Sequence, residues 1–316
     1  MRYGHAFACT HAFVFFCLFM AFPIYSAAEK IDPPWENSPQ GGVNFTVPGV
    51  DNAPDLYGDI NEPDLAIFLG GNEFMVLPEI VEAFKAAYPR YGKIYYETLP
   101  PGIVEEHLRT GSLVMGNLRV TVRPDIFMGG KDRVEALQKE GWFDKAVPYA
   151  QNRLAIMVYR GNPANIKSLS DLGRDDVKVG MPDQKIEDIG KKIIESYRKA
   201  GGESLEKKVM EEKVGNGSTV ITRIHHRQTP MWIMGQLVDA GPVWYTEAYF
   251  QQMIGNPTDM VEIPEKENST STSVAARLKD APHAQAAMDF LAFIRSERGQ
   301  SIYKKYGFQP APEEKR

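Results

Sequence analysis

From residue 62 onward, hydrophobic residues recur with two different periods. Short apolar runs with β-type composition, such as 64–71 (DLAIFLGG), are each followed by a polar or glycine-containing loop and then by a stretch with helical spacing. After Pro78, apolar residues recur at the spacing of one face of a helix, and a proline such as Pro78 is common in the first turn of a helix. This pattern predicts strands that alternate with helices.

The same alternation continues along the chain. Further strands are expected at 93–99, 124–130, 153–163, 177–183, 219–224 and 242–247. Further helices are expected at 102–110, 132–139 and 229–238, with another that carries Ile189 to Tyr197 and ends at Gly201. Alternation of this kind is typical of α/β proteins, with mostly parallel sheets flanked by helices. Their ligands bind where the loops at the carboxyl ends of the strands gather.

The first 28 residues differ from the rest of the chain. Arg2 precedes an apolar run at 12–22, and small residues follow as far as Ala28. This order predicts a secretory signal peptide at 1–28 and export to the periplasm as a soluble protein. The apolar run is shorter than the roughly 20 residues that a membrane span needs.

The remaining chain is that of an ordinary globular protein. Both cysteines, Cys9 and Cys17, lie in the expected signal peptide, so we expect neither a disulfide nor a thiolate site in the mature chain. Residues 29–60 are rich in Pro, Gly and Asn without a sustained period, which predicts a linker. A formal net charge of −5 argues against nucleic acid as a partner.

The segment 222–247 (TRIHHRQTPMWIMGQLVDAGPVWYTE) carries the most suggestive chemistry. Thr229 before Pro230 predicts a helix start, so 225–228 would lie between a strand and that helix. Free N–H groups and the helix dipole favour an anion there, and Arg227 adds a bidentate donor. The alternative is that Arg227 pairs with a surface carboxylate.

A metal site is the second interpretation of the same loops. Its expected ligands are His225, His226, Glu97 and Glu247, with Glu187 and Asp188 also beside the loops. Adjacent histidines point apart on a strand or a helix and rarely chelate one ion, so no metal is the first expectation. The mature chain also lacks the motifs of serine hydrolases, zinc proteases and phosphate-binding loops, so an enzyme is not expected.

Several phrases, in their order along the chain, resemble the type II periplasmic solute-binding proteins, particularly the molybdate-binding branch and the accessory colonization factor group. They are DLAIFLGGN, PDIFMGGKDRVEAL, NRLAIMVYRGNP with IKSLSDL and VKVGMPD, DAGPVWYTEA, and AMDFLAFIRSERGQSIYKKYGF. The last two phrases are the most specific of them.

The resemblance implies a two-lobe α/β fold, each lobe a mostly parallel sheet flanked by helices. Lobe 1 would comprise 62–148 and 248–316, and lobe 2 would comprise 149–247. Two crossover strands, near 148–156 and 245–250, would form the hinge. The family implies a monomeric receptor without a cofactor, which captures its ligand between the lobes and delivers it to the membrane permease of an ABC transporter.

The resemblance also assigns ligand-binding positions, one loop at a time. Those positions are Gly70, Gly71 and Asn72; Pro101 and Gly102; Asp188 within 187–190; His226, Arg227, Gln228 and Thr229; and Trp244 with Glu247. The molybdate binders use hydroxyl groups and backbone amides, whereas these positions hold Gly, Asn, Pro, acids and Trp. The expected ligand is therefore a small anion, either a molybdate- or tungstate-like oxyanion or a phosphorylated or carboxylated metabolite. The alternatives are a transition metal or metal chelate, and an adhesin or accessory colonization factor that reuses the fold.

Overall fold

The computed structural model describes residues 43–45, 55–116 and 118–312. The expected signal peptide lies outside them. No helix in the described part is long and apolar enough to cross a membrane.

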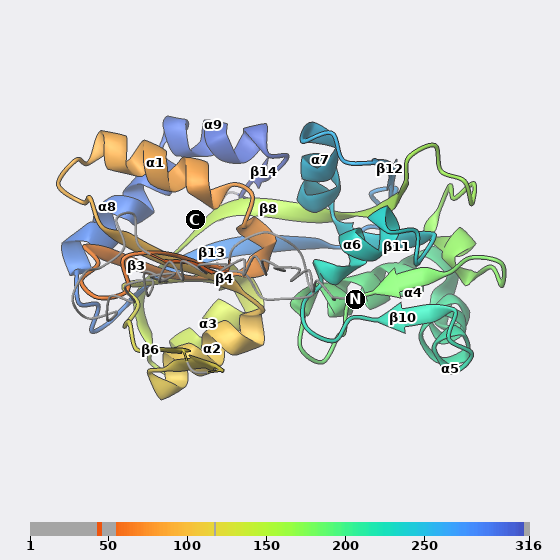
Figure 1. Ribbon diagram of the computed structural model, residues 1–316, viewed down its shortest axis with the longest axis horizontal. Helices are drawn as coiled ribbons and strands as arrows, with labels where there is room; N and C mark the ends of the chain where they lie inside the picture. Colours follow the sequence, from red (N-terminus) through yellow and green to blue (C-terminus); the bar gives the residue numbers. More distant parts are fainter. Residues whose placement is uncertain (1–42, 46–54, 117, 313–316) are drawn as a thin grey trace, which may run out of the picture. The chain divides into compact units, whose positions relative to one another are not determined.

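The described chain is a mixed α/β structure, which confirms the expected fold class (Figure 1). Its strands are β1 Val43–Phe45, β2 Leu56–Gly58, β3 Leu65–Gly70, β4 Ile94–Leu99, β5 Leu113–Met115, β6 Leu118–Val120, β7 Ile126–Gly130, β8 Phe143–Tyr159, β9 Val179–Met181, β10 Thr219–Ile221, β11 Ala240–Trp244, β12 Thr258–Glu262, β13 Thr270–Leu278 and β14 Gln309–Pro310. Its helices are α1 Leu77–Ala87, α2 Pro101–Thr110, α3 Lys131–Lys139, α4 Asp188–Lys207, α5 Lys213–Gly215, α6 Gln228–Met234, α7 Tyr245–Met253, α8 Ala284–Arg295 and α9 Glu297–Lys305, with short turns η1 Gly71–Glu73, η2 Leu169–Gly173 and η3 Lys208–Glu212.

The long strand β8 belongs to two groups of strands. Its residues 143–153 pair with β13, which continues through β7, β3, β4, β2 and β1; we call these strands the first sheet segment. Its residues 154–159 pair with β11 and β12, and β11 continues to β9 and β10; these form the second sheet segment. β3 is parallel to β4 and β7, and β9 is parallel to β10 and β11. The strands β8, β11, β12 and β13 pair antiparallel, so each parallel core is extended by antiparallel partners.

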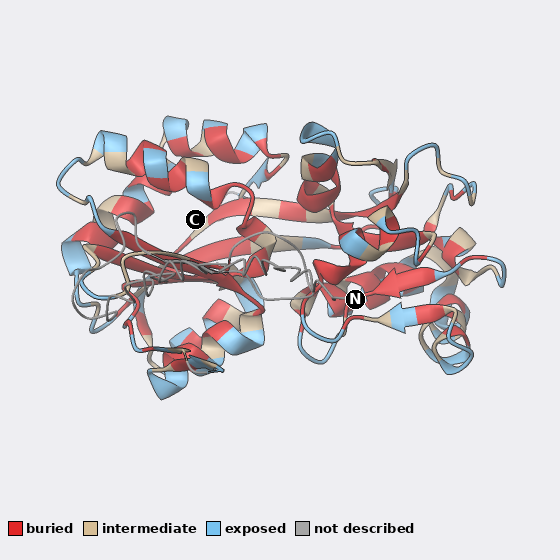
Figure 2. Ribbon diagram, viewed as in Figure 1, coloured by how far each residue is buried: buried red, intermediate tan, exposed pale blue. Residues whose placement is uncertain are grey.

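Helices cover both faces of each segment. Along β3, Leu65 and Ile67 pack with α1, α8 and α9, whereas Ala66 and Phe68 pack with α2 and α3 (Figure 1). In the same way, successive residues of the second half of β8 pack alternately with α4 on one face and with α6 and α7 on the other. The central strands are therefore buried on both faces (Figure 2), and each large apolar side chain there stabilises the fold by about 1.5–3 kcal/mol.

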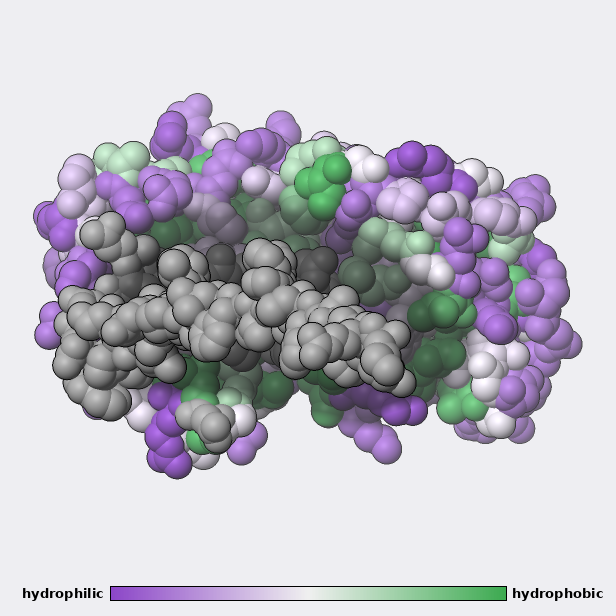
Figure 3. All heavy atoms as spheres, viewed as in Figure 1, coloured by the Kyte–Doolittle hydropathy of each residue, from purple (hydrophilic) through white to green (hydrophobic). Residues whose placement is uncertain are grey.

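The surface is mainly hydrophilic, with local exceptions. Figure 3 shows apolar side chains gathered over α7, where Tyr249, Met253 and Ile254 are 36%, 43% and 52% exposed. Exposed apolar residues of this number are ordinary in globular proteins.

Three sequence expectations need correction or refinement. Residues 245–250 are not a crossover strand but the start of α7, because Trp244 ends β11 and the helix follows without a loop. Within the expected linker, Val43–Phe45 and Leu56–Gly58 add strands to the sheet, and Leu56 is fully buried. The helix expected to end at Gly201 has non-helical backbone at Gly201 and Gly202, beyond which α4 continues. The limits of the two lobes stay predictions.

A buried carboxyl group ties three elements of the first sheet segment together. Glu73 of η1 is 2% exposed, and it accepts hydrogen bonds from the hydroxyl groups of Tyr149 on β8 and Tyr303 on α9. Burial raises the pKa of Glu73 to about 7, although these hydrogen bonds oppose the shift.

This shift gives stability a pH dependence. Between pH 4.5 and about 7 the folded chain keeps the Glu73 proton while the unfolded chain loses it, so the free energy of unfolding should fall as the pH rises. The fall attributable to Glu73 should be roughly 3 kcal/mol. Urea unfolding of the wild type and of Glu73→Gln across this pH range gives the free energy of unfolding of each protein. The contribution of Glu73 is the change with pH in the difference between these two free energies. A difference that does not change with pH would refute the prediction, and Glu106→Gln on the exposed face of α2 controls for the lost charge.

Candidate functional site

Loops that follow four parallel strands meet between the two sheet segments. A methyl group added at Gly71, after β3, would lie 2.1 Å from Nε2 of His225, in the loop after β10. It would also lie 2.8 Å from the carbonyl oxygen of Thr98 on β4. At Gly102 the nearest atom to such a group is the carbonyl oxygen of Ile186, at 3.9 Å, in the loop after β9. The carboxyl ends of the strands therefore converge, as the α/β pattern predicts.

Two histidines and two carboxylates fill the centre of this meeting point. We call Glu187, His225, His226 and Glu247 the His–Glu cluster; each of the four is only 1–2% exposed. His226 Nδ1 lies 3.1 Å from Glu187 Oε2, and its Nε2 lies 3.4 Å from Glu247 Oε1. The backbone N–H of His226 also donates to Glu187 Oε1 at 2.9 Å. His226 thus lies between two carboxylates.

The two histidines differ in charge. Burial alone would lower the pKa of His226, but the carboxylates of Glu247 and Glu187 outweigh it and raise this pKa to about 10. Burial lowers the pKa of His225 well below its ordinary value, and the positive charges of His226 and Arg227 lower it further. His225 is therefore a neutral ring beside a cationic one.

The tautomer of His225 follows from its neighbours. Its Nδ1 accepts a hydrogen bond from the backbone N–H of Arg227 at 3.2 Å, so this nitrogen carries no proton. The proton is on Nε2, which faces the carbonyl of Thr98.

Arg227 is paired inside the protein. Its side chain is 2% exposed and forms an ion pair with Asp55, which is fully buried just before β2. Its guanidinium also lies over the ring of Phe74, 4.7 Å from the ring centroid. A carboxylate partner was one of the two alternatives for Arg227, but this carboxylate is buried and comes from the expected linker. The ligand role of Arg227 stays a prediction.

The helix start beside the cluster also differs from expectation. α6 begins at Gln228, so Thr229 lies inside the helix and does not cap it. The side-chain oxygen of Gln228 accepts from the backbone N–H groups of Arg223 at 2.9 Å and Ile224 at 2.8 Å. It thereby satisfies donors of the loop before the helix, whereas Thr229 was expected to accept from an N–H group of the first helical turn.

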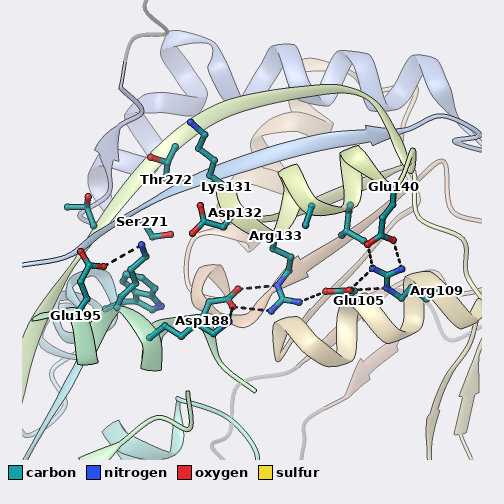
Figure 4. Close-up of a pocket in the computed structure, with 17 residues that line it drawn as sticks. Glu105, Arg109, Lys131, Asp132, Arg133, Glu140, Asp188, Glu195, Ser271 and Thr272 are labelled. Atoms are coloured by element: carbon teal, nitrogen blue, oxygen red, sulfur yellow. Dashed lines mark hydrogen bonds and ion pairs between the residues drawn. The ribbon is translucent and has the colours of Figure 1, made fainter. Parts of the chain in front are cut away.

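A cavity of about 490 Å³ is lined by elements of both sheet segments (Figure 4). The start of α3, the start of α4, the end of β11 and the first residues of β13 line it. From β13 come three consecutive residues with hydroxyl side chains, Thr270, Ser271 and Thr272. From α3 and α4 come Lys131, Asp132, Arg133, Asp188, Lys191 and Lys192.

A row of ion pairs closes one side of this cavity. Arg133 donates to both oxygens of Asp188, at 3.0 and 3.1 Å, and also pairs with Glu105 (Figure 4). Arg109 in turn joins Glu105 to Glu140, donating to the latter at 2.6 and 2.9 Å. The row connects α2 and α3, on the first sheet segment, with α4, on the second.

The predicted ligand positions fall into two groups. Near the His–Glu cluster the structure brings together Gly70, Gly71, Asn72, Pro101, Gly102, His226, Arg227, Gln228, Thr229 and Glu247. Asp188 and Trp244 line the cavity instead. Glu97, from the alternative metal set, lies 3.0 Å from His107 Nδ1 and forms a separate buried pair.

Sequence reasoning missed several residues of the cavity. It named Glu187 only as a possible cation ligand beside the loops, and its ligand positions include none of the polar run 266–278, although Thr270, Ser271 and Thr272 line the cavity. Five consecutive hydroxyl residues, 269–273, at the strand start were the available signal. The argument that adjacent histidines point apart is wrong here, because His225 and His226 lie in a turn with ring centroids 4.2 Å apart.

Comparisons with known proteins agree with this architecture. A family model described as bacterial extracellular solute-binding protein matches residues 65–309. No curated protein matches the chain significantly.

Solved structures share the fold at low sequence identity. The sulfate-binding protein SubI from Mycobacterium tuberculosis is 18% identical with a TM-score of 0.64, covering 78% of this chain and 86% of that one. The periplasmic molybdate-binding protein of Azotobacter vinelandii is 13% identical with a TM-score of 0.64, covering 79% and 100%. The substrate-binding domain of a putative molybdenum ABC transporter from Clostridium difficile is 19% identical with a TM-score of 0.58, covering 78% and 99%. The expected type II periplasmic-binding-protein fold is confirmed.

The buried pair of Arg227 and Asp55 gives a prediction about stability. Arg227→Ala should lower the free energy of unfolding by about 3–5 kcal/mol, because the buried Asp55 carboxylate loses this cationic partner. The double variant Asp55→Ala/Arg227→Ala should lose less than the sum of the two single variants. Urea unfolding measures all three proteins. The exposed Arg223→Ala should stay within about 0.5 kcal/mol of the wild type, and an equally small effect of Arg227→Ala would contradict the prediction.

Proposed function

The chain belongs to the family of bacterial extracellular solute-binding proteins, and from that premise we propose that it captures a small anion for import through an ABC transporter. The anion would be a molybdate- or tungstate-like oxyanion or a small phosphorylated or carboxylated metabolite. In this proposal the protein is an exported, monomeric receptor that catalyses no reaction, and its partner is a membrane permease.

The observation that supports this proposal is the composition of the cavity wall. Thr270, Ser271 and Thr272 of β13 line the same space as the first turns of α3 and α4. An added methyl group at Gly130, directly before α3, would lie 3.6 Å from Ser271 Oγ, so the backbone there comes close to a hydroxyl group. Hydroxyl groups and helix-start amides are neutral donors that suit a compact anion.

Charged side chains complement these neutral donors. Lys131, Lys191 and Lys192 line the cavity, each with a carboxylate 3.6–3.8 Å away, and Arg109 and Arg133 are paired more closely in the row of ion pairs. Lys131 and Lys191 are mostly exposed, with side-chain exposures of 58% and 67%. They raise the local concentration of anions, and the hydroxyl groups provide the short contacts.

The proposed lobes explain how binding is coupled to transport. The cavity takes its walls from both sheet segments, since α3 and β13 belong to the first and α4 and β11 to the second. A ligand that contacts both stabilises the arrangement in which they approach. A permease that recognises this arrangement would distinguish loaded from unloaded receptor.

A thermal-unfolding panel tests the proposal. The mature protein is heated with molybdate, tungstate, sulfate, phosphate and small phosphorylated or carboxylated acids. One of them should raise the midpoint, since a ligand at 100 times its dissociation constant adds about 2.7 kcal/mol. Calorimetry with that anion should show about 10-fold weaker binding to Ser271→Ala, which removes a hydrogen bond to a charged group.

Lys304→Ala provides the matched control for Lys131→Ala. Both substitutions remove one lysine charge, but Lys304 lies on the exposed face of α9 and does not line the cavity. Binding should weaken in Lys131→Ala and stay unchanged in Lys304→Ala. A panel without any stabilising anion, or one whose effect is the same in Ser271→Ala, would refute the anion proposal.

A further inference from the structure

We propose that Glu187, His225 and His226 bind a divalent first-row transition-metal cation. This site lies in the His–Glu cluster, is separate from the hydroxyl-lined cavity, and goes beyond the proposed capture of an anion. One ligand atom from each of the three residues lies within 4.8 Å of the other two.

The separations suit a single ion. Zinc binds histidine nitrogen and carboxylate oxygen at about 2.0–2.2 Å in a tetrahedron, which places neighbouring ligand atoms roughly 3.3–3.6 Å apart. Here Glu187 Oε2 lies 3.1 Å from His226 Nδ1, and Glu187 Oε1 lies 3.7 Å from His225 Nδ1. The two pairs involve different oxygens of Glu187, and each separation is within a few tenths of an ångström of the ideal value.

Groups behind the histidines hold their Nδ1 atoms near Glu187, and an ion there would replace the backbone N–H of Arg227 as the partner of His225 Nδ1. The carbonyl of Thr98 faces Nε2 of His225, and Glu247 Oε1 lies 3.4 Å from Nε2 of His226. Metal-binding histidines usually donate their second ring N–H to such a carbonyl or carboxylate, which fixes the tautomer and the ring orientation. Both histidines here have that arrangement.

Charge in the buried cluster also favours a cation. Among the residues described, Oε2 of Glu247 has no hydrogen-bond partner, and Oε1 has only the 3.4 Å contact with Nε2 of His226. Both groups are buried, where unsatisfied polar atoms are costly. Binding through Nδ1 of His226 would release the proton of this imidazolium to solvent. A dication with Glu187, Glu247 and two neutral imidazoles then has zero net charge, so the buried cluster would be neutral.

The ligand types restrict the ion. Two imidazoles and one carboxylate suit zinc, iron, cobalt, nickel and copper better than calcium or magnesium, which take oxygen ligands. Three protein ligands leave a fourth position for water or another small molecule.

Cobalt(II) and zinc(II) are the probes for the test. The mature protein is stripped with a chelator and titrated with cobalt(II), whose visible absorption reports a tetrahedral site, and then with zinc(II) in competition. One equivalent should bind. Glu187→Gln and His225→Gln should each lower the affinity by about 10-fold or more, as should Glu247→Gln, which leaves the three ligands in place. Circular dichroism and thermal unfolding confirm that each variant is folded.

Glu97→Gln is the matched control. Glu97 is also a fully buried carboxylate beside a histidine, but within the described part of the chain no third potential metal ligand accompanies this pair. Its substitution should leave the affinity unchanged. The proposal is overturned if the wild type binds neither ion, if the folded Glu187→Gln and His225→Gln variants bind as tightly as the wild type, or if Glu97→Gln loses as much affinity as they do. The titration contains no oxyanion, so its outcome is independent of the anion proposal.

Discussion

The imidazole ring of His225 packs directly on the backbone of Gly71, where no side chain would fit. This contact joins a loop of the second sheet segment to the ends of β3 and β4 in the first. The backbone carbonyl of Thr98 borders the same space, so the ring has backbone on two sides. The positions of His226 and Arg227, which follow His225 directly, depend on where this ring is held. The positions of the buried charged side chains therefore depend on the close packing of His225 against Gly71.

Charge compensation is the second constraint on the site. Asp55 neutralises Arg227, and Glu187 with Glu247 surrounds His226. Pairs buried to this extent add little net stability relative to apolar residues, but the loss of one partner is costly. Such pairs therefore favour one arrangement of the loops over others. The cavity is separate from these pairs, and hydroxyl residues and exposed lysines line it.

Much of the fold could be predicted from hydrophobic periodicity, because its strands are buried on both faces and its helices carry regular apolar stripes. The convergence of the loops after β3, β4, β9 and β10 also followed from this pattern. The partners of individual charges could not be predicted, since Arg227 meets Asp55 across 172 positions of the chain. The orientation of the His225 and His226 side chains could not be predicted either, because a turn does not impose the side-chain directions of a strand or a helix. The helix at 245–253 was missed because its aromatic residues, Tyr245 and Tyr249 among them, have the composition of a strand.

The most direct test of this account is the stability of Gly71→Ala compared with Gly92→Ala. A side chain at Gly92 would meet no atom within 4 Å, whereas one at Gly71 would overlap His225 and the backbone of Thr98. Urea unfolding should show a loss of about 1–3 kcal/mol for Gly71→Ala and a much smaller change for Gly92→Ala. Equal stability of the two variants would show that His225 does not pack on Gly71, and the arrangement of loops described above would then be wrong.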